Sequence, residues 1–229
     1  MNKLSKIVGT VCISLMGSIG SANADSSAFT GAYVAINGSA LGIAANGTRT
    51  KTVGHADSRT QKGAMGMVSP AVGAEAGFSY PLSDMAFITV GVQYQPFDTD
   101  VKGESVTNAT NVTLTTNDIV SIFIEPSFNV TENSAFFIKV GASESEISAT
   151  GTNVTNKTYD LSGTTLAMGT KTISDNGLFL KTEAGITDYD SITIGNIKES
   201  DGHDTSTFTS SVKADVELAY GAVTIGYKF

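Results

Sequence analysis

The sequence predicts an all-β protein: an eight-stranded antiparallel transmembrane β-barrel with the strand order of an up-and-down meander. Three observations support this fold class. Short stretches of alternating apolar and polar residues occur along the whole chain, as expected of strands with one apolar face. The connections between these stretches are alternately long and short. The last stretch stays apolar on one face up to the final residue, Phe229.

The start of the chain has the features of a secretory signal peptide. Lys3 and Lys6 precede an uncharged apolar stretch at 7–20, and small residues just before Asp25 form a cleavage site. The apolar stretch is short for a bilayer span, although an uncleaved anchor is the alternative. We therefore expect cleavage after Ala24. The remaining 25–229 would form the barrel domain, located in the cell outer membrane, and would contain no cysteine.

Eight segments show the two-residue period of a strand, in which alternate side chains point to opposite faces. They are residues 29–42, 65–80, 85–96, 118–130, 135–148, 176–187, 192–198 and 211–229. Short turns are expected at 81–84, 131–134 and 188–190, and long polar connections at 43–64, 97–117, 149–175 and 199–210. Strict alternation of this kind is typical of membrane barrels, which have short periplasmic turns and longer outer loops. A closed barrel also pairs every backbone group, as lipid requires.

The apolar pattern changes phase within the last predicted strand. Apolar residues fall at even positions from 212 to 220 and at odd positions from 223 to 229. A bulge at Gly221 would shift the phase inside one strand, whereas a turn at 220–222 would create a ninth strand. Because bacterial single-chain barrels have even strand counts, the bulge is the interpretation we favour.

The face opposite the apolar one carries charges of both signs. These residues are Glu75, Glu125, Lys139, Lys181, Glu183 and Glu217. If the apolar face meets lipid, the charges point into the barrel, where they should pair because an unpaired buried charge is costly. Eight strands leave room for side chains but hardly for a channel. The sequence therefore predicts a plugged interior held by ion pairs.

Aromatic residues gather where the predicted strands meet the short turns. They are Phe78, Tyr80, Phe128, Tyr227 and Phe229. Tyrosine and other aromatic side chains favour the membrane–water interface, so this grouping predicts an aromatic girdle at the periplasmic end.

With this ending the chain resembles the small Gram-negative outer-membrane barrels of the opacity-protein, OmpX-like and OmpA transmembrane-domain kind. In that family the last strand alternates apolar residues and ends in Phe. Tyr227 and Phe229 match that ending, with Val223 and Ile225 in step before them. The resemblance implies that Phe229 anchors the barrel at the interface and is an insertion signal for the barrel-assembly machinery. It covers essentially all of 25–229, but the loops match no subfamily.

Composition and residue types limit the function. The net charge is −8 and no basic run occurs, which makes nucleic acid a poor partner. A serine-type catalytic site needs a base, usually histidine, and the two histidines both lie in predicted loops. We therefore expect no enzyme activity and no cofactor.

The function class expected is a non-catalytic envelope-structural or surface-interaction role, adhesin- or antigen-like, through four outer loops. The expected partners are outer-membrane lipid, lipopolysaccharide, the barrel-assembly machinery and an extracellular ligand of unknown identity. Two alternatives stay open. One is a small passive porin-like channel for ions or small solutes. The other is a soluble lipocalin-like barrel whose apolar face points inward to bind a ligand.

The histidines also define a candidate metal site. If the first strand closes against the last, the first and last long loops are neighbours, and they contain His55, Asp57, Asp201, His203 and Asp204. Imidazole and carboxylate groups together can bind a transition metal. The spacing matches no known motif, so we interpret these as solvated loop residues.

Overall fold

The computed structural model describes residues 26–52, 58–96, 99–103, 112–151, 157–199 and 208–229. The predicted signal peptide lies outside these residues. In the described part of the chain, the elements are η1 (Ser26–Phe29), β1 (Gly31–Thr52), β2 (Ser58–Ser83), β3 (Ala86–Gln95), β4 (Thr99–Gly103), β5 (Val112–Thr131), β6 (Ser134–Gly151), β7 (Lys157–Ile173), β8 (Leu178–Tyr189), β9 (Ile192–Glu199) and β10 (Phe208–Lys228). None of the described residues forms a helix long and apolar enough to cross a membrane.

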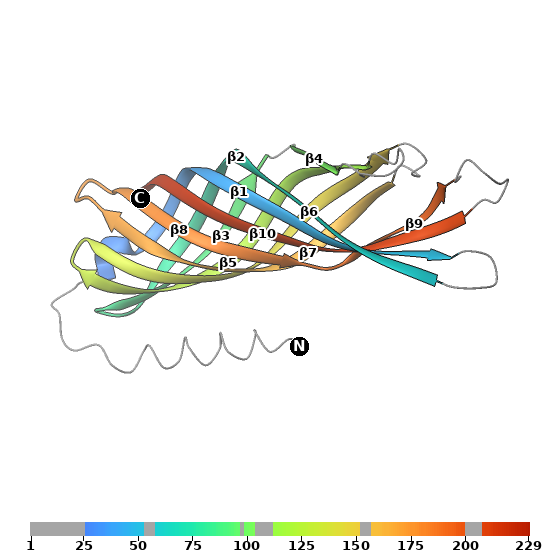
Figure 1. The fold of residues 1–229 in the computed structure, drawn as a ribbon. Coiled ribbons are helices and arrows are strands. Elements are labelled where there is room, and N and C mark those ends of the chain that lie inside the picture. Colours follow the sequence, from blue (N-terminus) through green and yellow to red (C-terminus); the bar gives the residue numbers. More distant parts are fainter. Residues whose placement is uncertain (1–25, 53–57, 97–98, 104–111, 152–156, 200–207) are drawn as a thin grey trace.

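The described strands occupy eight positions in a closed antiparallel ring (Figure 1). β4 continues the line of β3, because both pair with β5, and β9 continues the line of β8, because both pair with β10. β10 closes the ring by pairing with β1 from Lys228 to Thr209. The predicted fold class, an eight-stranded antiparallel barrel, is therefore confirmed.

Strand register fixes the tilt of the barrel. A row of paired residues can be followed once around the ring: Glu217, Asp188, Thr164, Ala142, Ile122, Val92, Ala76, Val34 and Tyr227. The row returns to β10 ten residues from its start, at Tyr227 instead of Glu217. With eight strands, an offset of this size requires a strand tilt of about 40°.

The prediction missed one strand of the ring, β7, and counted residues 192–198 as a separate strand. These two errors cancel, so the predicted number of eight strands is still correct. The segment that forms β7 was expected to be loop, because its outward-facing positions are mostly Thr and Ser instead of larger apolar residues. The expected turn at 188–190 is no chain reversal, since β8 and β9 run along the same partner strand. The third short turn lies at 174–177 instead, between β7 and β8. Much of the expected loop 43–64 is also strand, because β1 extends to Thr52 and β2 begins at Ser58.

The predicted bulge at Gly221 is also wrong, and there is no ninth strand at that position. β10 pairs residue by residue with β1 through this region, so its register does not slip. Val216, Leu218, Ala222 and Thr224 are all buried in the interior. The apolar pattern changes phase because the composition of the barrel interior changes along the strand. The interior is apolar in the half far from the short turns and polar in the half near them.

Beyond the closed ring, the strands separate into two sheets. β2 pairs with β3 only from Ala74 toward the short turns, and β7 pairs with β8 only from Gly163 toward the short turns. Farther out, β2, β1, β10 and β9 form one sheet, while β4, β5, β6 and β7 form the other. Figure 1 shows β1, β2, β9 and β10 leaving in one direction and β4 and β6 in another, at the end away from the C-terminus.

An apolar core fills the space between the two sheets of this extension. Its buried residues are Leu41, Ile43, Ala71, Ile119, Ile147, Ala149, Leu161, Tyr189, Ile192, Ala214, Val216 and Leu218. Both sheets contribute to it, which is the arrangement of a small β-sandwich. The part of the molecule that sequence patterns suggested was loop is thus a packed extension of the barrel.

Candidate functional site

Six buried charged residues meet in the barrel interior. They come from five strands and comprise three acids and three bases: Glu75 on β2, Glu125 on β5, Lys139 on β6, Lys171 on β7, and Lys181 and Glu183 on β8. Their charges sum to zero, so the interior carries no net charge at this level. Inward alternation on each strand brings them together, because residues two apart along a strand share a face.

Lys181 is the centre of this ion network. Its Nζ lies 2.6 Å from Glu75 Oε1, 3.4 Å from Glu125 Oε2 and 3.5 Å from Glu183 Oε2. The Lys181 side chain has no exposed surface. A lysine this deeply buried is stable as a cation only if its partners compensate for lost hydration, and here three carboxylates do so.

The other two lysines complete the network. Lys139 Nζ lies 2.7 Å from Glu183 Oε2 and 3.6 Å from Glu75 Oε2, and Lys171 Nζ lies 3.1 Å from Glu125 Oε1. Every carboxylate therefore contacts at least two ammonium groups, which ties all five strands together.

Aromatic rings enclose the charges on the side of the short turns. The Tyr33 hydroxyl donates a hydrogen bond of 2.7 Å to Glu75 Oε1. Lys171 Nζ lies 5.2 Å from the centre of the Tyr33 ring and 5.6 Å from that of Phe179, within the range of cation–π attraction. Phe29 of η1 stacks on Phe87 with ring centres 5.0 Å apart, and both are buried. The residues just before β1 thus help to close the barrel at the end of the short turns.

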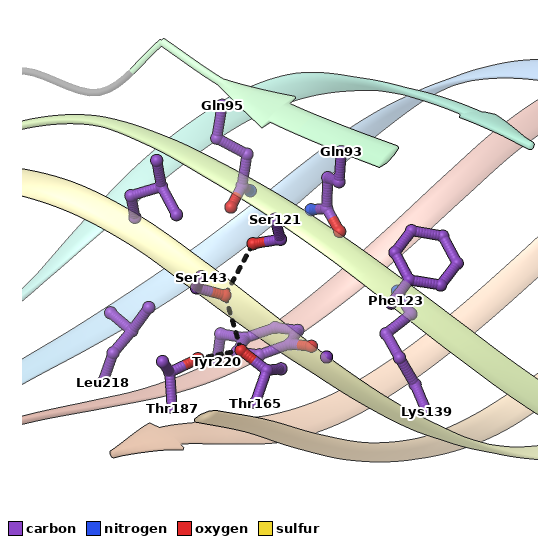
Figure 2. Close-up of a pocket in the computed structure, with 12 residues that line it drawn as sticks. Gln93, Gln95, Ser121, Phe123, Lys139, Ser143, Thr165, Thr187, Leu218 and Tyr220 are labelled. Atoms are coloured by element: carbon purple, nitrogen blue, oxygen red, sulfur yellow. Dashed lines mark hydrogen bonds between the residues drawn. The ribbon is translucent and has the colours of Figure 1, made fainter. Parts of the chain in front are cut away.

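On the outer side of the network, a row of hydroxyl groups crosses four strands. Ser121 and Ser143 are joined by a hydrogen bond of 2.7 Å, Ser143 and Thr165 by one of 2.6 Å, and Thr165 and Thr187 by one of 2.8 Å. Figure 2 shows this row beside Lys139 and the neighbouring polar and apolar side chains. The cavity they line has a volume of about 20 Å³, which is room for about one water molecule.

The structure brings together five of the six charges that the sequence placed inside: Glu75, Glu125, Lys139, Lys181 and Glu183. The sixth assignment is wrong, because Glu217 is exposed on the outward face of β10. That error follows from the supposed phase shift at Gly221.

Lys171 belongs to the network and was missed, because its strand was expected to be loop. A signal was present in the sequence. From 167 to 173, Ala, Gly, Lys and Ile alternate with Met, Thr and Thr, and the first set faces inward. Threonine has a high strand propensity, so alternation alone could have identified the strand.

The five residues of the predicted aromatic girdle face outward near the short turns. Phe78, Tyr80, Tyr227 and Phe229 are exposed, and Phe128 is half-buried. The Tyr227 and Phe229 rings meet edge to face with centres 5.4 Å apart. The Phe229 amide donates to the carbonyl oxygen of Ala32 at 2.9 Å, so β1 holds the chain end in place.

At the opposite end of the ring, exposed carboxylates end the apolar band on five strands, and we call these residues the acidic belt. The acidic belt consists of Asp118 on β5, Glu144 and Glu146 on β6, Asp160 on β7, Asp188 on β8 and Glu217 on β10. Because the strands are tilted, residues at one height along the barrel axis are displaced along the chain from each strand to the next, and these displacements add up to the ten-residue offset. After this displacement is taken into account, the residues of the acidic belt lie within about two residues of one height. At that height the outward residues of β1 and β2 are Gly42 and Val68, which are uncharged, so the belt is interrupted at these two strands.

The candidate metal residues His55, Asp57, Asp201, His203 and Asp204 lie outside the described residues. Within the described ranges, no group of three or more His, Cys, Asp or Glu side chains is arranged to hold a metal ion.

Comparison with known proteins places the fold. No protein-family model matches the chain, and no curated protein matches it in sequence. Among solved structures, the chain is similar to the outer membrane protein OprG from Pseudomonas aeruginosa, with a TM-score of 0.54 and 13% identity over 87% of this chain and 96% of that one. The chain has the fold of an outer-membrane β-barrel.

Lower-scoring similarities are to two other outer-membrane barrels. Ail, the attachment invasion locus protein of Yersinia pestis, has a TM-score of 0.43 and 10% identity over 84% of this chain and 98% of that one. Neisserial surface protein A has a TM-score of 0.41 and 11% identity over 84% and 97%. In outer-membrane barrels the short turns face the periplasm. In this chain the acidic belt and the two-sheet extension lie at the end of the ring opposite the short turns.

Proposed function

We propose that the protein is a non-catalytic outer-membrane barrel that is closed to ions and presents its two-sheet extension and outer loops at the cell surface. The observation that carries this proposal is the ion network around Lys181. A cation crossing the barrel would have to displace a lysine bound by three carboxylates, and breaking a buried pair of this kind costs about 3–5 kcal/mol.

Further layers along the barrel axis support a closed interior. The aromatic cluster around Phe87 lies on the periplasmic side of the charges, and the apolar core around Leu41 lies on the outer side. An apolar constriction opposes ion passage because ions lose hydration there. The passive-channel alternative would require a continuous water path through all of these layers.

The lipocalin-like alternative has the barrel faces reversed. In the membrane half, large apolar residues such as Ile36, Val72 and Ile122 are more than 60% exposed on the outside, while the charges face inward. A soluble ligand-binding barrel would need the opposite arrangement. The outward apolar surface instead fits contact with lipid.

Planar-bilayer conductance of residues 25–229, refolded in detergent, tests the closed barrel. The expected result is an electrically silent membrane that contains folded protein, shown by a heat-modifiable gel band. A general porin added afterwards to the same membrane should produce conductance steps, which confirms that the assay detects channels. Discrete and reproducible openings of the protein itself would overturn the proposal and favour the channel.

A further inference from the structure

The outward surface of β1 differs from that of every other strand of the barrel in the described residues. Between residues 38 and 44 the outward positions of β1 are Gly38, Ala40, Gly42 and Ala44, with no larger side chain among them. Their outward partners on β10 include Ala219 and Gly221. A Cβ atom added at Gly38 or at Gly221 would meet no atom within 4 Å, so the surface beside these residues is open.

Larger apolar residues border these small ones on both sides. On β2, Val72 is the partner of Gly38 and Val68 is the partner of Gly42, and these valines are 68% and 75% exposed. On the other side, Ile186 of β8 is the partner of Ala219, and it is 48% exposed. The small residues therefore form the floor of a shallow apolar groove that runs along β1 from Gly38 to Ala44 and ends at the exposed side chain of Ile36. We call it the β1 groove.

The groove reaches the outer surface where the acidic belt is interrupted. The outward face of β1 and β2 carries no carboxylate at that height, whereas Glu217 on β10 and Asp188 on β8 lie beside the gap. The phosphate groups of outer-leaflet lipids are negatively charged, so the belt repels them at the five strands that carry it. Along this part of the circumference, β1 and β2 are the sector that anionic headgroups can approach most closely.

Two lysines lie above the outer end of the groove. Thr48 on β1 faces outward, and its register partners on the two neighbouring strands are Lys62 and Lys213. Both lysines are exposed. Neighbouring strands are about 4.8 Å apart, so the two lysines start about 10 Å apart and can both reach one anion above Thr48.

The surface at this point is concave. A hollow of about 460 Å³ is lined by Asn46, Thr48, Lys62, Gly63, Ala64 and Asp215, among others. Asn46 and Thr48 add an amide and a hydroxyl group to the donors supplied by the lysines. Lys62 and Asp215 are the charged residues that line the hollow, and Lys213, the partner of Thr48 on β10, lies beside the lining and leaves an excess of positive charge around Thr48.

We propose that this face binds a phosphorylated glycolipid of the outer leaflet, with an acyl chain in the β1 groove and a phosphate at Lys62, Lys213 and Thr48. The occupant follows from the combination of an apolar groove at membrane depth, a gap in the acidic belt and two cations four residues farther out along the strands. The inference rests on the outer-membrane location but not on the closed state of the barrel.

Binding of bis-phosphorylated lipid A tests the site directly. The refolded chain in zwitterionic micelles is titrated with lipid A, and bound lipid is counted by native mass spectrometry. Lipid A from which both phosphates have been removed, and inorganic phosphate alone, are titrated in parallel. Wild-type protein should retain one bis-phosphorylated lipid and at least about tenfold less of the dephosphorylated form, because charge-assisted hydrogen bonds are the strong ones.

Matched variants separate the two parts of the site. The double variant Lys62→Gln/Lys213→Gln should weaken lipid binding about tenfold, whereas Lys157→Gln, an exposed lysine on β7, should not. Gly38→Leu places a side chain in the groove at a position where its Cβ atom meets no other atom, and it should weaken binding about fivefold. Ala142→Leu, on the lipid face of β6, is its control. A heat-modifiable gel band checks that each variant folds.

Several outcomes would overturn the proposal. They are equal retention of dephosphorylated lipid, wild-type affinity in the double lysine variant, or losses in the two control variants as large as in the site variants. Inorganic phosphate that displaces the lipid completely would show a headgroup site with no role for the groove. A dimer that disappears in Gly38→Leu would show that a second copy occupies the groove. Conductance of the same protein would contradict the closed barrel while leaving this test intact.

Discussion

Lys181 shows how one residue decides the character of the barrel interior. Its ammonium group contacts carboxylates from β2, β5 and its own strand, and the contacts with β2 and β5 cross the ring instead of following neighbouring strands. Hydrogen bonds between strands fix each strand only to its neighbours. The ion network adds contacts between strands that are not adjacent, and it fills the space that would otherwise admit water.

Replacing Lys181 should destabilise the folded barrel. In Lys181→Met the three carboxylates lose their shared partner in a buried site, and we expect a loss of about 3–5 kcal/mol in unfolding free energy. The measurement is urea unfolding in lipid vesicles, followed by the heat-modifiable gel shift. Lys157→Met, at an exposed position, is the matched control and should behave like wild type.

A second substitution distinguishes loss of charge balance from loss of packing. Adding Glu75→Gln to Lys181→Met removes one of the uncompensated charges, and the Tyr33 hydroxyl can still donate to the amide oxygen. The double variant should therefore be more stable than Lys181→Met alone. Equal or lower stability would mean that the network does not act as a charge-balanced unit.

At the scale of elements, β7 and β10 show why strand prediction in membrane barrels is difficult. The lipid-facing side of β7 carries Thr164, Met168, Thr170 and Thr172, which is less apolar than on other strands. In β10 the interior changes from apolar to polar along the strand, and this reverses the phase of the hydrophobic pattern without any change of register. Both strands keep the two-residue alternation. What differs from other strands is which face, inward or outward, carries the apolar residues.

A charge on the lipid face of β7 tests whether this strand crosses the membrane. Met168 is 58% exposed and lies about six residues inward from the acidic belt, so Met168→Arg should cost about 2–4 kcal/mol of folding free energy in vesicles. Ser162→Arg, on the same strand and level with the belt, should cost about 0–1 kcal/mol. Equal effects of the two substitutions would place the whole segment outside the membrane.

At the scale of the whole molecule, two folding regions share the same strands. The inner region is a closed barrel that depends on ring closure, buried charges and lipid. The outer region is a sandwich of two sheets that depends on its own apolar core. Strands β1, β2, β5, β6, β7 and β10 run through both regions, so the barrel orients the sandwich and the outer connections that it carries.

Damage to the outer core should therefore affect the extension alone. Ile147 is 1% exposed in that core, and Ile147→Asp places an unpaired charge there. On intact cells, added protease should cut the variant in the extension and leave a protected membrane fragment. Ser148→Asp, one residue along on the other face of β6, should stay as resistant as wild type. Loss of the membrane fragment together with the extension would show that the two regions unfold as one.

The sequence by itself determined what local pattern can determine. The two-residue period, the alternating connections and the apolar ending of the chain predict a closed membrane barrel, and five of the interior charges follow from alternation alone. Those features depend on residues close together in the chain, so they can be recognised without knowing which strands are neighbours.

The tertiary structure alone decided which residues meet across the ring. It placed Lys171 in the ion network, moved Glu217 to the outer surface, and joined β8 to β9 as partners of the same strand. It also showed that the outer half is a packed sandwich and that the acidic belt is interrupted at β1 and β2. These features depend on register and shear, which relate residues far apart in the chain, and alternation along one strand carries no information about either.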